Sequence, residues 1–292
     1  MLVFDYLHAN PAVFITVIGV LGLMVGSFLN VVIYRLPLML EREWRSQCRE
    51  LLDLDPAVEE APFNLAVPRS RCPHCGHAIT AMENIPILSY LALRGRCSSC
   101  GASISARYPI VEAATGLISV AVAWRFGFSV HTPAALVLSW ALIALSMIDY
   151  DHKLLPDAIT LPVLWLGLLL GVFGVFISAP QSVIGAVAGY LSLWVVFKLF
   201  KLMTGKEGMG YGDFKLLALL GAWMGWQMLP VIIILSSVVG AAVGIGLIAL
   251  AGRDRSVPIP YGPYLAAAGW IALLWGHDIV SAYLQWAGLR GV

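Results

Sequence analysis

Long apolar runs separated by short polar segments dominate the chain, and most runs are as long as a membrane-crossing helix. Such a helix needs about 20 mostly apolar residues to cross the roughly 30 Å hydrocarbon layer. Eight runs fit this pattern, near residues 12–34, 110–128, 133–149, 159–178, 181–203, 214–229, 230–251 and 261–287, of which the sixth is short. The pattern predicts an all-α polytopic membrane protein with about eight transmembrane helices.

One long polar segment, residues 35–109, interrupts the apolar pattern between the first two runs. Its nine Arg and eight Asp or Glu residues are nearly balanced, and it contains all five cysteines. We expect a small soluble loop subdomain here. The predicted domain plan is therefore an N-terminal region and first helix (1–34), the loop subdomain (35–109) and a seven-helix membrane domain (110–292).

Composition agrees with a membrane protein, because 60% of the residues are hydrophobic and only 12% are charged. Soluble domains contain roughly 45 to 50% apolar residues. The net charge is +1, and no basic face large enough to neutralise a phosphate backbone is visible. We therefore expect no nucleic-acid partner. The expected partner is the lipid bilayer. The first run lacks the basic start and small-residue exit of a cleaved signal peptide, so we expect a retained helix.

The distribution of basic residues predicts the orientation in the membrane. If the N-terminus lies outside, all Lys and Arg residues except Arg125 and Arg290 fall in cytoplasmic loops or at the helix ends beside them. Cytoplasmic loops carry an excess of Lys and Arg. We therefore expect both termini to lie outside and the 35–109 loop to lie in the cytoplasm.

Two C-x2-C pairs stand in the polar loop, each followed by glycine. They place Cys72, Cys75, Cys97 and Cys100 at the spacing of a four-cysteine metal site, and we expect structural zinc. Two disulfides, or iron with the same ligands, are the alternatives, and a cytoplasmic position disfavours disulfides. A closed shell of four sulfurs has no open position for catalysis, so this metal is expected to fold the loop.

Two aspartates lie at the ends of apolar runs. A charged side chain at membrane depth is costly, roughly 2.5 to 3.5 kcal/mol for Asp at the centre of a membrane helix on insertion scales. Asp149 closes the third run and Asp213 opens the sixth, so the predicted topology puts both at the cytoplasmic face. Two neighbouring Asp side chains cannot both ionise easily, and together they can activate a water and protonate a leaving amine. That is the chemistry of aspartyl proteolysis.

Simpler interpretations of these aspartates stay open at this point. Asp213 follows Gly210 and Gly212 at a predicted helix start, where an Asp often serves as an N-cap, and the glycines permit positive φ and close approach. For Asp149, the alternative is a place in a cluster of charged residues at the membrane interface. For Asp157, which follows Pro156, capping of the fourth helix is the preferred interpretation.

Several motifs then occur together in one order along nearly the whole chain. They are GSFLNVVIYRLP (26–37), the two C-x2-C pairs, NIPILSYL (84–91), RGRC (94–97), RYPIVE (107–112), IDYDHKLLPD (148–157) and GYGDFKLL (210–217). In this combination the chain resembles the type IV prepilin peptidases, bifunctional leader peptidases and N-methyltransferases of pilus and type II secretion systems.

The resemblance implies an aspartyl protease of the bacterial inner membrane, with Asp149 and Asp213 as its catalytic residues. It also implies that the leader of a prepilin or pseudopilin is cut at the cytoplasmic face. The new N-terminal residue is then methylated with S-adenosylmethionine as methyl donor.

The sequence identifies the residues for methyl transfer less clearly, and no Gly-rich cofactor signature is present. Glu112, at the start of the second run, is the candidate for orienting the incoming amine or the methyl donor, with an interfacial helix-end residue as the alternative. Two rival functions remain for the whole chain. They are an ion- or proton-coupled transporter with a regulatory zinc loop, and a non-catalytic scaffold of the secretion apparatus.

Overall fold

The computed structural model describes residues 2–54, 61–206, 208–251 and 259–288 of the 292-residue chain. The described residues are helical apart from loops, short 3-10 turns and two isolated β-bridges. The predicted all-α fold is confirmed. The chain forms two compact units, Met1–Phe128 and Ser129–Val292.

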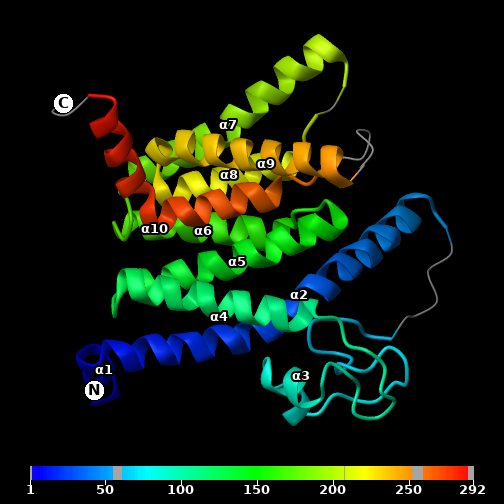
Figure 1. Ribbon diagram of the computed structural model, residues 1–292. Coiled ribbons are helices and arrows are strands. Elements are labelled where there is room, and N and C mark those ends of the chain that lie inside the picture. Colours follow the sequence, from blue (N-terminus) through cyan, green and yellow to red (C-terminus); the bar gives the residue numbers. More distant parts are fainter. Residues whose placement is uncertain (1, 55–60, 207, 252–258, 289–292) are drawn as a thin grey trace. The chain divides into compact units, whose positions relative to one another are not determined.

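The first unit is built on two helices that pack side by side, α2 (Pro11–Leu51) and α4 (Arg107–Phe126) (Figure 1). A short helix α1 (Leu2–Ala9) precedes them, and the 3-10 turn η1 (Met82–Asn84) and α3 (Leu88–Ala92) lie in the loop between them. Glycines on α2 face α4: an added Cβ at Gly26 would lie 2.8 Å from the Cα of Glu112. Small residues at such a crossing let two helix backbones approach closely.

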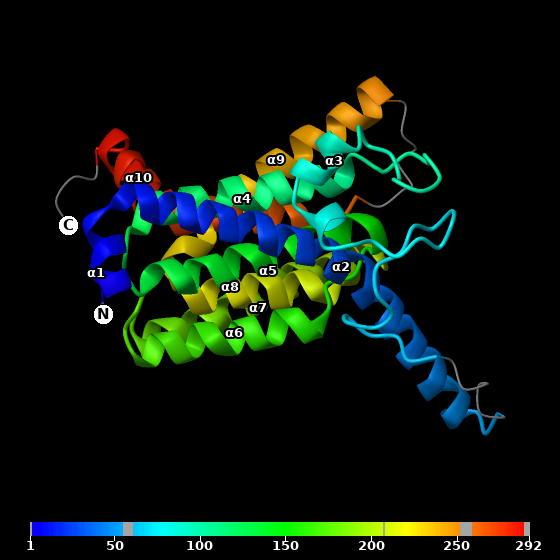
Figure 2. The ribbon, with the colours of Figure 1, turned by 90° about the horizontal axis from the view of Figure 1, so that it is seen from below.

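Helix α2 is longer than the first apolar run predicts. It continues beyond residue 34 to Leu51, so the first part of the predicted soluble loop is helical, with Pro37 inside the helix. In both views the last turns of α2 extend past the end of α4 (Figures 1 and 2). The segment after Pro37 is rich in Leu, Glu and Arg, which are strong helix formers, and this explains the extension.

The second unit is a helical bundle with one helix at its centre. Its helices are α5 (His131–His152), α6 (Asp157–Val172), α7 (Ala179–Thr204), α8 (Tyr211–Met224), α9 (Leu229–Ala251) and α10 (Gly262–Trp286), with a 3-10 turn η2 (Trp226–Met228) between α8 and α9. Helices α6, α7, α9 and α10 contact α8 (Figure 2). Every residue of α8 from Leu216 to Met224 is buried, so the short sixth run is a core helix of the bundle.

Each of the eight predicted apolar runs corresponds to a helix, although not every helix has the length of a full span. Within the described residues, six helices are long and apolar enough to cross a membrane. The remaining two, α6 with 16 residues and α8 with 14, are shorter. The count of eight spans is therefore approximate, and the chain is a multi-pass membrane protein.

Candidate active site and metal centre

Asp149 lies in the last turn of α5 with its side chain buried, 6% exposed. Its Oδ2 accepts a hydrogen bond of 3.0 Å from the backbone N–H of Gly262, the first residue of α10. The first N–H groups of a helix have no partner within the helix and carry its positive dipole end, so they attract a carboxylate. The first turn of α10 thus holds the side chain of Asp149, which lies in the last turn of α5.

Asp213 is the third residue of α8 and is buried to a similar degree, 8% exposed. The backbone N–H of Gly210 interacts with its carboxylate, and the charge of Asp149 acts on it. At the third helical position a carboxylate can accept the N–H of the N-cap residue, here Gly210. The two aspartates therefore lie within electrostatic reach of one another, inside one unit and at converging helix ends.

Leu155 shows how these helix ends converge. It lies in the short connection between α5 and α6 and is buried. A Cβ added at Gly212 would lie 2.9 Å from the Leu155 Cβ, and one added at Gly262 would lie 3.3 Å from its Cδ2. One side chain therefore touches the first turns of both α8 and α10, beside the two carboxylates.

The two glycines before Asp213 differ in what the fold requires of them. Neither is among the residues with positive φ, so the fold does not use the freedom that glycine permits there. Gly212 is required by close approach, because a side chain there would collide with Leu155. Gly210 is the N-cap of α8 in an extended conformation, with φ −80° and open space where a Cβ would be.

Asp157 has a different role from the predicted cap. It is the first residue inside α6, Pro156 occupies the N-cap position, and no side-chain cap is formed. Both carboxylate oxygens of Asp157 instead accept hydrogen bonds of 2.7 Å from Lys215 Nζ on α8. The capping prediction is wrong because the ammonium group is a stronger partner for this carboxylate than the first N–H groups of α6.

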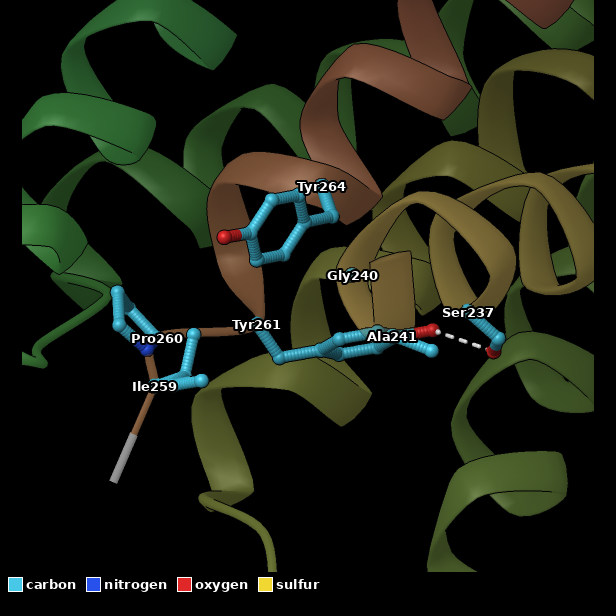
Figure 3. Close-up of a pocket in the computed structure, with 7 residues that line it drawn as sticks. All are labelled: Ser237, Gly240, Ala241, Ile259, Pro260, Tyr261 and Tyr264. Atoms are coloured by element: carbon cyan, nitrogen blue, oxygen red, sulfur yellow. Dashed lines mark hydrogen bonds between the residues drawn. The ribbon is translucent and has the colours of Figure 1, made fainter. Parts of the chain in front are cut away.

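A small pocket of about 290 Å³ lies beside the start of α10 (Figure 3). The Tyr261 hydroxyl lies 3.3 Å from Ser237 Oγ, the bond drawn in the figure, and 2.6 Å from Ser236 Oγ. Both serines belong to α9. The phenol therefore ties the residue before Gly262 to a neighbouring helix and helps to hold the N–H that Asp149 accepts. Sequence reasoning missed Gly262 and Tyr261, whose only signal is their place at the start of the last apolar run.

In the first unit, each C-x2-C pair folds into the same tight turn. The N–H of Cys72 donates to the carbonyl of His77 at 2.9 Å, and the N–H of Cys97 donates to that of Ala102 at 2.8 Å. The glycine after each pair has positive φ, +72° at Gly76 and +71° at Gly101. Only glycine adopts this conformation readily, which explains its place in both turns. Each turn directs two sulfurs to one point.

The four sulfurs lie at distances suited to a tetrahedral metal ion. All lie within 4.8 Å of one another, with Cys72 Sγ 3.8 Å from Cys100 Sγ and Cys75 Sγ 3.9 Å from Cys97 Sγ. Zinc–sulfur bonds of about 2.3 Å in a tetrahedron place the sulfurs about 3.8 Å apart. A disulfide joins its sulfurs at about 2.05 Å, so the cysteines are not paired in that way. The residues present fit a metal with four thiolate ligands.

Backbone groups favour thiolates in this cluster. The N–H groups of Cys75 and His74 lower the pKa of Cys72 to about 7. At Cys100 the Ala102 N–H lowers the pKa, but the neighbouring sulfurs and burial outweigh it and raise the pKa to about 11. Four thiolates this close repel one another unless a cation lies between them, which supports a metal site.

Glu83 connects the two cysteine turns, and sequence reasoning missed it. Its carboxylate accepts hydrogen bonds from the Thr80 N–H and hydroxyl, both 2.8 Å, and from the Ser98 hydroxyl, and it lies 3.3 Å from His77 Nε2. The Ser98 and Thr80 donors lower the pKa of Glu83 to about 2. The available signal was that Glu83 is the one acidic residue between the two pairs.

Glu112 lies in the first turns of α4 and is buried, 8% exposed. Its Oε2 accepts a hydrogen bond of 2.8 Å from the backbone N–H of Ile87. Glu112 also lines a cavity of about 510 Å³, whose wall includes Cys72 and Cys97 of the metal cluster. The predicted methyl-transfer residue thus faces a cavity in the first unit, whereas Asp149 and Asp213 lie in the second.

Comparison with known proteins identifies related sequences along almost the whole chain. Residues 20–126 match the family model described as Bacterial Peptidase A24 N-terminal domain, and residues 136–245 match the Type IV leader peptidase family. No solved structure matches the chain.

Full-length relatives carry one name. The chain is 60% identical over 285 residues to the prepilin leader peptidase/N-methyltransferase of Stutzerimonas stutzeri, covering 98% of this chain and 99% of that protein. It is 58% identical over 286 residues to the protein of that name from Pseudomonas aeruginosa, with 98% and 99% covered. The Aeromonas hydrophila protein is 59% identical over 284 residues, with 97% and 98% covered. With this identity along both units, the chain belongs to the prepilin leader peptidase/N-methyltransferase family.

Proposed function

We propose that this protein is a membrane aspartyl endopeptidase that removes the leader of type IV prepilins and pseudopilins. It then N-methylates the new N-terminal residue using S-adenosylmethionine. One observation carries the peptidase half of the proposal: two buried carboxylates, Asp149 and Asp213, lie within electrostatic reach of one another at converging helix ends in one unit. The names of the full-length relatives support both halves, and none of the relatives described above is named as a transporter.

The two carboxylates divide the work of peptide hydrolysis. Close together, they share one proton, so one is an acceptor and the other a donor. The ionised Asp takes a proton from water as the water oxygen bonds to the scissile carbonyl carbon. The protonated Asp then supplies a proton to the leaving amine nitrogen as the carbon–nitrogen bond breaks. The hydrogen bond from Gly262 fixes the direction of Asp149 during this exchange.

The metal is expected to be structural zinc held by Cys72, Cys75, Cys97 and Cys100. These four thiolates leave no position for substrate or water, so the ion stabilises the loop and takes no part in hydrolysis. Iron accepts the same ligands, and metal analysis of the purified protein distinguishes the two.

We place both termini outside the bacterial inner membrane and the aspartates at its cytoplasmic face. The distribution of Lys and Arg supports this orientation. Lys153 directly follows α5 and Lys215 lies in the first turns of α8, so both helices carry a basic residue at the end that holds an aspartate. A substrate whose apolar segment remains in the bilayer then presents its basic leader to this face.

A reconstitution experiment tests the proposal. The purified full-length protein is mixed with a prepilin, with and without S-adenosylmethionine, and the products are measured by mass spectrometry. The expected result is leader removal in both samples and a mass increase of one methyl group only with the donor. An intact prepilin in both samples would refute the peptidase activity. Ion or proton flux through the protein reconstituted in liposomes would support a transporter instead.

A further inference from the structure

The pocket between α9 and the start of α10 adjoins the candidate active site, and the chemistry of the two aspartates does not use it (Figure 3). Its volume of about 290 Å³ lies just below the roughly 300 to 1,000 Å³ of small-molecule sites, so it suits one side chain better than a cofactor. We propose that this pocket binds an apolar side chain of the substrate, from the first residues after the bond that is cut. This inference rests on the proposed peptidase activity and adds a subsite that holds its substrate.

The pocket begins one residue away from the contact that directs Asp149. Tyr261 lines the pocket, and the next residue, Gly262, donates its N–H to Asp149 Oδ2 at 3.0 Å. Neighbouring Cα atoms are about 3.8 Å apart, and an extended peptide advances about 3.3 to 3.6 Å per residue. A substrate whose scissile bond lies at the aspartates therefore reaches the pocket with a side chain from one of the nearest residues.

The lining of the pocket selects an uncharged occupant. None of the seven described residues that line it carries a charge. The hydroxyls of Tyr261 and Ser237 lie 3.3 Å apart and bond to one another, which leaves ring faces and the aliphatic groups of Ile259 and Pro260 for a ligand (Figure 3). A charged side chain placed here would lack a partner, which is costly. Because the proposed leader is basic, the occupant comes from the other side of the cut bond, where the apolar segment begins.

Two glycines one turn apart on α9 leave the space for this side chain. A Cβ added at Gly240 would lie 3.3 Å from Cδ2 of Tyr264, and one added at Gly244 would lie 3.2 Å from Cδ1 of Ile259. Both distances are shorter than most contacts of a real Cβ, so a side chain at either position would press on its neighbour. Gly240 lines the pocket itself, so a branched side chain there would fill it.

The surface of α9 beside the pocket is open to an apolar partner. Val238, Val239 and Val243 are 62%, 42% and 40% exposed, and the sequence of α9 contains no charged residue. An exposed apolar helix face in a membrane protein contacts lipid or another apolar helix. The apolar segment of the proposed substrate stays in the bilayer, so it can approach along this face. One of its first side chains then enters the pocket as the scissile bond arrives at the aspartates.

A double-mutant cycle between pocket and substrate tests the subsite. The purified full-length protein and its Gly240→Val variant each cleave a prepilin and three derivatives, in which one of the first three residues after the cut bond is replaced by Ala. For the side chain that occupies the pocket, this replacement should lower kcat/KM of the wild type by about tenfold or more. In Gly240→Val the same replacement should change kcat/KM by less than about twofold, because the pocket is already filled.

Gly246→Val is the matched control. Gly246 lies in the same helix, and an added Cβ there would meet nothing within 4 Å. This variant should respond to each Ala derivative as the wild type does, and helicity and thermal unfolding check that both variants are folded. A folded Gly240→Val protein that shows the wild-type fold-changes at all three substrate positions would overturn the subsite, even if it cleaves every substrate more slowly.

A second pair of variants enlarges the pocket and does not depend on whether Gly240→Val folds. Ile259→Ala should raise kcat/KM, by about threefold or more relative to the parent prepilin, for a derivative with Trp at the position that the wild type identifies. Ile245→Ala, at a 67% exposed position on α9, should not. An unchanged preference in Ile259→Ala contradicts the subsite.

Two further outcomes separate the possible failures. A phospholipid that copurifies with the wild type and is lost from Gly240→Val, with substrate preference unchanged, would assign the pocket to lipid and overturn the subsite. Wild-type protein that cleaves none of the prepilins refutes the proposed peptidase activity itself. Wild-type protein that cleaves them all at equal kcat/KM refutes only the subsite.

Discussion

The contact between Gly262 and Asp149 makes the sharpest prediction about the candidate active site. A Cβ added at Gly262 would lie 2.6 Å from Asp149 Oδ2 and 3.1 Å from its Cγ. The first distance is about 0.8 Å shorter than ordinary van der Waals contact, so Gly262→Ala must displace the carboxylate. It also weakens the 3.0 Å hydrogen bond that directs the carboxylate. The fold can absorb this change, because a short side chain can move away.

Activity should suffer far more than stability. A displacement of about 1 Å at a reacting group can lower a rate by about a hundredfold, so we expect cleavage by Gly262→Ala to fall roughly ten- to a hundredfold. Overpacking of this size costs about 1 to 3 kcal/mol of stability, which leaves a folded protein. The assay is the initial rate of leader removal from a purified prepilin, with helicity and thermal unfolding measured on the same sample.

Gly246→Ala is the matched control. Gly246 lies within α9, and an added Cβ there would meet nothing within 4 Å. Both variants carry the same change in backbone entropy, so only Gly262→Ala combines it with a collision at a candidate catalytic group. If folded Gly262→Ala protein cleaves as fast as Gly246→Ala, the position of the Asp149 carboxylate does not limit the reaction. The assignment of Asp149 would then lose its geometric support.

Three further predictions concern the other charged and sulfur-bearing residues. Asp149→Ala and Asp213→Ala should each abolish leader cleavage while metal content and folding persist, and full processing by either variant would exclude the aspartyl mechanism. Asp157→Asn should keep measurable cleavage and lose at most about 1 kcal/mol of unfolding free energy, because its ion pair with Lys215 is half exposed. Cys72→Ser should lose bound metal and lower the unfolding temperature of the purified protein, whereas Cys48→Ser should do neither, since Cys48 is exposed and outside the cluster.

Local patterns in the sequence predicted the helices and the metal cluster well. An apolar run of sufficient length must form a helix in a bilayer, because unpaired backbone groups are too costly there. In each C-x2-C pair followed by glycine, a few neighbouring residues determine the geometry of the turn, so the cluster could also be predicted from the sequence. The end of α2 could not be predicted in this way. Hydropathy marks where the apolar residues stop, and a helix can continue beyond that point into water.

The supporting contacts of the site could not be predicted from the sequence. The Gly262 N–H that directs Asp149 comes from a helix that starts more than a hundred residues later, and nothing local marks it as a partner. Asp157 is a second case. Its position after a proline predicts a helix cap, but the fold brings Lys215 beside its carboxylate. Glu83 and Ile87 also gain their roles only through neighbours brought together by the loop.

By itself, the sequence determined the membrane class, the apolar helices, the four cysteines and the two aspartates as candidates, because each depends on composition or short spacing. Only the tertiary structure decided that Asp149 and Asp213 converge, that α8 is a buried core helix, and that Glu112 faces a cavity beside the cysteine turns. The physical reason is that an apolar helix suits lipid or protein equally well. Packing against other helices selects which faces are buried and which side chains meet.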